Sequence, residues 1–112
     1  MQDELLYSFR ESPQFTKRMA GLMSDDEYSV LQWYLQQHVA EGDIVVGGGG
    51  LRKLRWKAPG RGKRGGLRLI YYWADARGCI YLVAVYAKNE KSDLTKQELQ
   101  RLKVLVEEWL DE

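Results

Sequence analysis

Cations at alternate positions in residues 51–57 are the strongest chemical signal in this sequence. Lys53, Arg55 and Lys57 alternate with Leu54 and Trp56, and this period of two predicts a β-strand with the cations on one face. Like charges side by side on a strand repel each other, so the arrangement is costly unless a polyanion or an acidic partner covers it. The pattern therefore indicates a surface that binds phosphate groups. It leaves open the alternative of a solvated sheet edge that lysines protect from aggregation.

A second signal is one arginine inside an apolar run. Residues 66–74 are apolar on both faces of a predicted strand except at Arg68. An arginine in a buried strand requires an anion, and no acidic residue close to it in the sequence is an obvious partner. Arg68 is therefore a candidate ligand for a phosphate group.

The positive charge of the chain is concentrated around these positions. Residues 51–91 carry eleven basic and two acidic side chains, although the net charge of the whole chain is only +1. Such a surface attracts polyanions, above all nucleic acids. Further candidates for contacts with RNA phosphates are Arg52, Lys57, Arg61, Lys63, Arg64 and Lys91.

Several kinds of catalysis fit the sequence poorly. Metal-dependent nucleases need converging carboxylates, and this block has only Asp75 and Glu90, so no metal site and no cofactor are expected. His38 is the only histidine and falls on a predicted helix, which argues against a histidine-based hydrolase. The glycine-rich loop fails the nucleotide-binding pattern, because Lys57 and Arg64 occupy required positions.

Lysine, arginine and tyrosine remain as the available chemistry. Cleavage of RNA by its own 2′-hydroxyl needs a base for that hydroxyl, cations for the developing phosphoryl charge, and a proton for the departing 5′-oxygen. Surrounding positive charge is expected to lower the pKa of a lysine or tyrosine toward neutrality. Tyr86 and Lys88, two residues apart at the end of a predicted strand, are the candidates for proton transfer.

The elements that must position these side chains can be predicted from periodicity and capping signals. Helix starts are indicated by the capping signals at Ser12-Pro13, Ser24 to Glu27 and Thr95 to Glu98. The glycines at 47–50 indicate a flexible connector. Successive strands joined by short turns imply an antiparallel meander. The expected order is a strand at 4–10, helices at 13–22 and 25–38, strands at 51–57, 66–74 and 79–87, and a helix at 95–110.

Length and cysteine content set the broad class. We expect one α+β domain over residues 1–112, with an antiparallel sheet core, two N-terminal helices and one C-terminal helix. The single cysteine, Cys79, excludes an internal disulfide and favours the reducing cytoplasm. No signal peptide or membrane-spanning run is apparent, so a cytoplasmic location is expected.

With these residues in view, the chain resembles RelE-superfamily toxins of bacterial type II toxin–antitoxin systems, most closely the HigB-type branch. The similarity rests on three segments, residues 50–56, 62–73 and 81–95, and on the order of the elements. It implies a metal-independent endoribonuclease that cuts mRNA in the ribosomal A site. It also implies a cognate helix-turn-helix antitoxin, HigA-like, as a partner beside the ribosome.

Site residues transfer from the family position by position. Lys53 and Arg55 correspond to the basic pair on the family's first core strand, and Arg68 to the arginine at the scissile phosphate. RelE has an arginine and then a tyrosine after the last strand, whereas Asn89 and Thr95 occupy about these places here. Tyr86 and Lys88 take the proton-transfer role by proximity.

Two other functions are compatible with the same charge pattern. A non-catalytic module could use the basic sheet face to bind RNA, DNA or an acidic protein. A ribonuclease that needs no ribosome is the third possibility. An adjacent reading frame for a helix-turn-helix antitoxin would favour the toxin.

Overall fold

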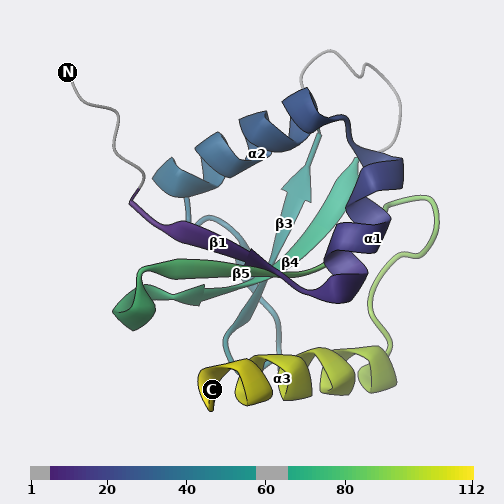
Figure 1. The fold of residues 1–112 in the computed structure, drawn as a ribbon. Helices are drawn as coiled ribbons and strands as arrows, with labels where there is room; N and C mark the ends of the chain where they lie inside the picture. The colour runs from purple at the N-terminus through teal and green to yellow at the C-terminus, as the bar shows by residue number, and fades with distance from the viewer. Residues whose placement is uncertain (1–5, 58–65) are drawn as a thin grey trace.

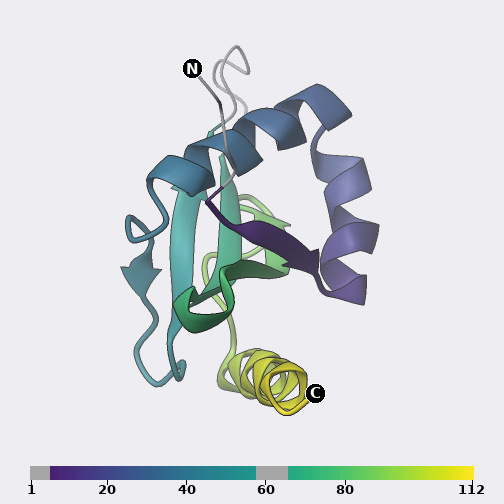
Figure 2. The same cartoon turned by 60° about the vertical axis from the view of Figure 1, so that its left-hand side comes forward.

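A five-stranded sheet separates two layers of helices in the computed structural model, which describes residues 6–57 and 66–112. Helices α1 (Pro13–Leu22) and α2 (Asp25–Gln37) cover one face, and α3 (Lys96–Leu110) covers the other (Figures 1 and 2). The strands are β1 (Ser8–Glu11), β2 (Asp43–Ile44), β3 (Leu51–Trp56), β4 (Leu67–Ala74) and β5 (Cys79–Ala87). The expected α+β architecture is confirmed.

The sheet is mixed, with the order β1-β5-β4-β3-β2. Its centre is the predicted antiparallel meander of β3, β4 and β5. The sequence analysis did not predict that β1 pairs with β5 in parallel, or that β2 lies at the far edge. A strand of two residues leaves no period in the sequence that could reveal it.

Each helix begins where the sequence predicts, because a side-chain oxygen at the N-cap accepts a backbone N–H of the first turn. Ser24 and Thr95 form capping boxes with Glu27 and Glu98. Ser12 is fully buried and has two roles: its Oγ accepts from Phe15 and donates to the carbonyl of Val83 at 2.6 Å. This hydroxyl therefore joins the start of α1 to the middle of β5.

The alternation of side chains along β3, β4 and β5 divides the core into two clusters. Leu54, Trp56 and Leu69 face α1 and α2. Leu51 and Ile70 face α3, where they meet Leu102, Val106 and Trp109. The cations that alternate with Leu54 and Trp56 consequently share the α3 face, and they lie beyond the part of it that the helix buries.

The glycines at 47–50 form a tight turn instead of the predicted flexible connector. The N–H of Val45 donates to the carbonyl of Leu51. Gly47, Gly49 and Gly50 have positive φ angles, which residues other than glycine rarely adopt. A Cβ on Gly50 would come within 2.8 Å of the Tyr72 ring. The turn therefore fixes where β3 begins, and with it the position of the cationic strand.

Candidate functional site

Three predicted site residues lie in one row across the centre of the sheet. Arg55 on β3 is directly opposite Arg68 on β4, and Arg68 is directly opposite Tyr86 on β5. Directly opposed residues of antiparallel strands have Cα atoms about 5 Å apart and project to the same face. The structure thus brings together side chains that are 31 residues apart at the ends of the row, on the face that α3 shares.

Lys53 lies one step along β3 from Arg55, on the same face. Its Nζ forms an ion pair with Asp93 at 3.3 Å. Lys53, Arg55 and Asp93 line a pocket of about 340 Å³ between the β2–β3 turn and the N-terminus of α3. The other lining side chains include Asp43, Val45, Lys96 and Leu99.

The guanidinium charges of the two arginines in the row are not neutralised by neighbouring carboxylates in the described residues. Neither Arg55 nor Arg68 forms an ion pair with a carboxylate anywhere in residues 6–57 and 66–112. Arg68 makes only a long contact of 3.4 Å from its guanidinium to the carbonyl of Leu67. Two guanidinium groups on adjacent strands without a carboxylate between them have the chemistry that suits an anion such as a phosphate.

Tyr86 is nearly buried, with 4% of its surface exposed. Its hydroxyl is also buried and has no hydrogen-bond partner within the described part of the chain. Burial raises the pKa of Tyr86, the charge of Asp93 raises it further, and Arg68 opposes both. The expectation of a lowered pKa is therefore wrong for this residue, because loss of solvation outweighs the cationic surroundings.

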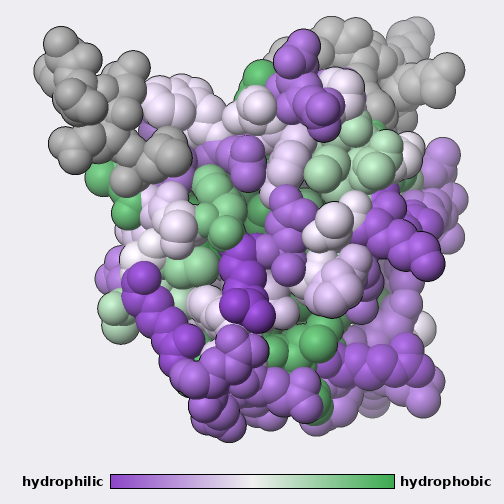
Figure 3. All heavy atoms as spheres, in the orientation of Figure 1, coloured by the Kyte–Doolittle hydropathy of each residue, from purple (hydrophilic) through white to green (hydrophobic). Residues whose placement is uncertain are grey.

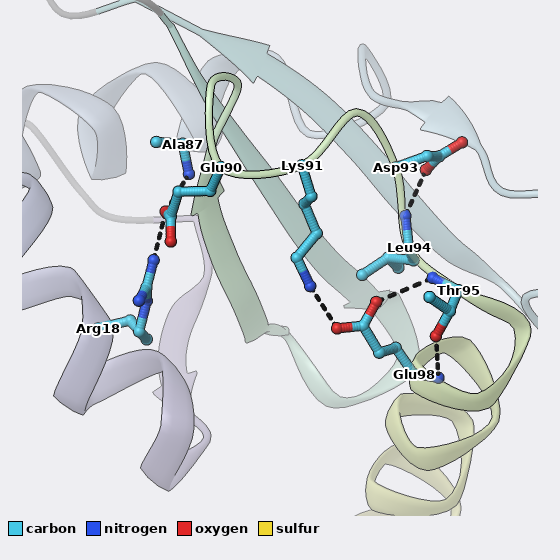
Figure 4. Close-up of polar contacts among 8 residues, drawn as sticks. All are labelled: Arg18, Ala87, Glu90, Lys91, Asp93, Leu94, Thr95 and Glu98. Atoms are coloured by element: carbon cyan, nitrogen blue, oxygen red, sulfur yellow. Dashed lines mark hydrogen bonds and ion pairs between the residues drawn. The ribbon is translucent and has the colours of Figure 1, made fainter.

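The connection from β5 to α3, residues 88–95, is held by ion pairs to three different elements; we call it the β5–α3 loop. Glu90 accepts from Arg18 on α1 and from the backbone of Ala87, and Lys91 donates to Glu98 on α3 (Figure 4). Asp93 binds Lys53 on β3. These contacts lower the pKa of all three carboxyl groups, chiefly through hydrogen bonds from Ala87 to Glu90, from Leu94 to Asp93 and from Lys91 to Glu98.

Other predicted RNA-binding residues are distributed differently. Arg52 lies on the opposite face of β3, where its guanidinium donates to the carbonyls of Ala40 and Gly42 and lies over Trp73. Its charge therefore supports the segment before β2 and does not belong to the row. Lys57 is exposed, one residue beyond the end of β3. Lys88, the predicted proton-transfer residue beside Tyr86, is likewise exposed, one residue beyond the end of β5. Lys91 is paired with Glu98 and lies over the Tyr86 ring.

Three candidates, Arg61, Lys63 and Arg64, lie outside the described residues. His38, which was not expected to act in catalysis, is the exposed C-cap of α2. Cys79 is a buried free thiol at the start of β5. Within the described ranges, no three His, Cys, Asp or Glu side chains gather in a way that could hold a metal ion. No helix there is long and apolar enough to cross a membrane.

Asp93 is the site residue that the sequence analysis missed. The predicted basic block ends at residue 91, and Asp93 follows two positions later. A second reason is that Asp93 reaches Lys53 only through the course of the β5–α3 loop, which no local pattern specifies. The one available signal was its place in the third family-like segment, residues 81–95.

Comparison with known proteins places the chain in a family. A model described as the RelE toxin of the RelE / RelB toxin-antitoxin system matches residues 15–112. The chain therefore belongs to the RelE toxin family. Among solved structures, it is similar to E. coli toxin RelE in the free state, a variant with two arginines replaced by alanine.

That similarity has a TM-score of 0.51 at 14% sequence identity, over 88% of this chain and 95% of the E. coli chain. At such low identity it shows a shared fold. The predicted superfamily is confirmed, while the HigB-type branch stays a prediction.

Proposed function

We propose that this toxin is an endoribonuclease that cuts mRNA in the ribosomal A site and so inhibits translation. Its family supports this proposal, and one observation carries it: Arg55, Arg68 and Tyr86 lie in register on three adjacent strands, and the arginines have no carboxylate partner in the described structure. Unpaired cations beside a buried phenol suit a phosphodiester whose charge increases during cleavage.

Each residue of the row has a role in this proposal. Arg68 binds the scissile phosphate, and Arg55 with Lys53 stabilises the negative charge that develops on its oxygens. Tyr86 keeps its proton at neutral pH because its pKa is raised by burial, so it donates to the departing 5′-oxygen. Lys57 and Lys91, together with Arg61, Lys63 and Arg64, are proposed to bind RNA around this centre. Lys88 stays the second proposed residue for proton transfer.

The attack by the 2′-hydroxyl is proposed to proceed without a metal ion. Cationic side chains supply the charge stabilisation that a metal would otherwise provide. Cleavage that persists in excess EDTA on ribosomes kept intact with polyamines would support this part of the proposal. We also propose a HigA-like helix-turn-helix antitoxin as the partner that holds the toxin inactive.

Replacement of Arg68 by alanine tests the proposal directly. Induced expression of the wild-type chain should stop growth and produce new mRNA 5′ ends within codons that are being translated. Arg68→Ala should lose about 100-fold or more in cleavage rate, because a charge-stabilising contact in the transition state is removed. Its melting temperature should stay close to that of the wild type, because Arg68 makes no ion pair with the described residues.

Arg10→Ala is the matched control, since it removes the same charge from edge strand β1, where Arg10 pairs with Glu112. This variant should stop growth as the wild type does. Full toxicity of Arg68→Ala would exclude its role. A wild-type chain that binds mRNA and leaves it uncut would instead favour the non-catalytic binding module.

A further inference from the structure

We propose that Asp93 is the general base that removes the proton of the attacking 2′-hydroxyl. This inference rests on the ribonuclease activity proposed above and assigns a role to a residue outside the predicted site. Three features of the structure lead to it: the place of Asp93 in the pocket, the way its carboxylate is held, and the state of the competing groups.

Asp93 lies among the residues that would bind the phosphate. It pairs with Lys53 and lines the same pocket as Lys53 and Arg55. Its charge also reaches the hydroxyl of Tyr86, whose pKa it raises. A carboxylate in this place lies beside two of the cations that are proposed to stabilise the phosphate.

The carboxylate is held by one oxygen only. Oδ1 accepts the backbone N–H of Leu94 at 2.8 Å and the Nζ of Lys53 at 3.3 Å. Oδ2 has no hydrogen bond within the described residues, and it points away from Leu94 in Figure 4. One anchored oxygen fixes the group, while the other keeps its lone pairs for a substrate hydroxyl. The side chain of Asp93 is 66% exposed, so RNA can reach it.

The other groups near the row are less suited to accept a proton. Tyr86 is protonated at neutral pH. The Nζ of Lys53 already donates to Asp93. Both carboxylate oxygens of Glu98 are occupied, by Lys91 and by the backbone of Thr95. Asp43 on β2 lies directly opposite Lys53 and lines the pocket, but no ion pair joins its carboxylate to Lys53.

The proposed step balances protons and bonds. Oδ2 of Asp93 takes the proton of the 2′-hydroxyl as the 2′-oxygen forms a bond to phosphorus, and the bond from phosphorus to the 5′-oxygen breaks. The departing oxygen takes the proton of the Tyr86 hydroxyl and leaves as a 5′-hydroxyl. The other product is a 2′,3′-cyclic phosphate. Solvent then removes the proton from Asp93 and returns one to Tyr86.

The test is single-turnover cleavage of an mRNA on programmed ribosomes by Asp93→Asn. We expect a loss of about 100-fold or more in rate, the usual contribution of a general base. Affinity for the mRNA should be unchanged or higher, because a negative charge is removed from a phosphate-binding surface. Asp93→Glu, which keeps a carboxylate, should recover part of the rate and guards against loss of activity by misfolding.

Two further variants make the test specific. Glu90→Gln neutralises the other carboxylate of the β5–α3 loop, which pairs with Arg18 on α1, and should cut at the wild-type rate. Asp43→Asn neutralises the second carboxylate of the pocket. A loss in Asp43→Asn equal to that in Asp93→Asn would show that the pocket's charge matters and not the base, which would overturn the proposal.

The pH dependence provides an independent readout. Hydrogen bonds from Leu94 and Lys53 lower the pKa of Asp93, so the base is fully ionised above about pH 5. The wild-type rate should therefore be flat between about pH 6 and pH 8, whereas a lysine base would give a rise of about tenfold per pH unit. The other charged groups that line the pocket are Asp43, Lys53, Arg55 and Lys96.

The outcomes separate the two proposals. A wild-type chain without cleavage activity refutes the proposed function. A wild type that cuts, with Asp93→Asn cutting equally fast, refutes only the role of Asp93. Faster cleavage and tighter binding by Asp93→Asn would show that this carboxylate merely competes with phosphate for Lys53, and would also overturn the proposal.

Discussion

The hydroxyl of Tyr86 is buried beside Arg68 and lacks a hydrogen-bond partner in the part of the chain that the structure describes. Burying a hydroxyl without a partner costs about 1–3 kcal/mol, so this group is unfavourable for folding. Such a cost is typical of functional groups that find their partner only in the complex with substrate.

Tyr86→Phe should therefore separate activity from stability. We expect cleavage to slow by about 10- to 100-fold, because the departing oxygen loses its proton donor. The free energy of unfolding should stay the same or rise, because the unsatisfied hydroxyl is gone. Denaturant titration and single-turnover rates measure the two effects. A clearly lower stability would reveal a structural role for the hydroxyl and remove the reason for assigning it to the reaction.

At the scale of single residues, the sequence predicts which side chains share a face of the sheet. It does not predict how deeply each side chain is buried or which partner it contacts. Period two is enough to place Lys53 and Arg55 together, and to predict that Arg68 is an isolated cation in an apolar strand. The same alternation places Arg52 on the opposite face of the strand, although a simple count of basic residues groups it with Lys53 and Arg55. The pKa of Tyr86 depends on burial, which the sequence of β5 alone does not give, and the pairing of Lys53 with Asp93 depends on a loop.

Among the elements, the segment before β2 is attached to the sheet by the Tyr71 hydroxyl. This group is fully buried, accepts the N–H of Gly42 at 3.0 Å and donates to the carbonyl of Val39 at 2.6 Å. A Cβ on Gly42 would lie 2.7 Å from the same oxygen, so only glycine allows this approach. The end of α2 is thereby connected to the centre of β4.

Tyr71→Phe should lower the free energy of unfolding by about 1–3 kcal/mol, because it leaves a buried N–H and a buried carbonyl without their partner. Tyr72→Phe is the matched control: its hydroxyl makes no hydrogen bond within the described chain, and its removal should change stability by less than about 0.5 kcal/mol. Chemical denaturation of the two variants gives the comparison. Equal losses would mean that Tyr71 contributes by packing alone.

Elements with strong local signals were predicted nearly to the residue, and those that depend on long-range pairing were not. Capping residues and amphipathic spacing define the three helices, and alternation with short turns defines the meander. The parallel pairing of β1 and the existence of β2 come from contacts between segments far apart in the chain. Neither leaves a local pattern in the sequence.

Across the whole molecule, charge is unevenly divided. Residues 1–50 carry three basic and eight acidic side chains, and residues 92–112 carry three and six, in contrast to the basic block between them. Figure 3 shows hydrophilic side chains gathered over α3, along the bottom of the view. A polyanion is thus attracted to the sheet face and repelled by much of the surface around it, which orients the encounter.

Affinity for mRNA should consequently fall steeply as salt concentration rises, because counterions are released from the RNA when cations bind its phosphates. Removing one phosphate contact by Arg55→Ala should reduce the slope of log affinity against log salt by about 0.7. Lys17→Ala, an exposed change on α1 across the sheet, should leave the slope unchanged. Fluorescence anisotropy with a labelled RNA at several salt concentrations measures these slopes. Equal slopes for both variants would show that the row does not contact phosphate.

The parallel pair of β1 and β5 has a consequence for synthesis of the toxin. The hydrogen bond from Ser12 to Val83 joins residues 71 apart in the chain, so the first strand finds its partner only after β5 has left the ribosome. At about 5–20 residues per second, the N-terminal segment waits for several seconds. Because Arg55, Arg68 and Tyr86 also align only when β5 is present, a nascent chain lacks the proposed catalytic row until translation is well advanced.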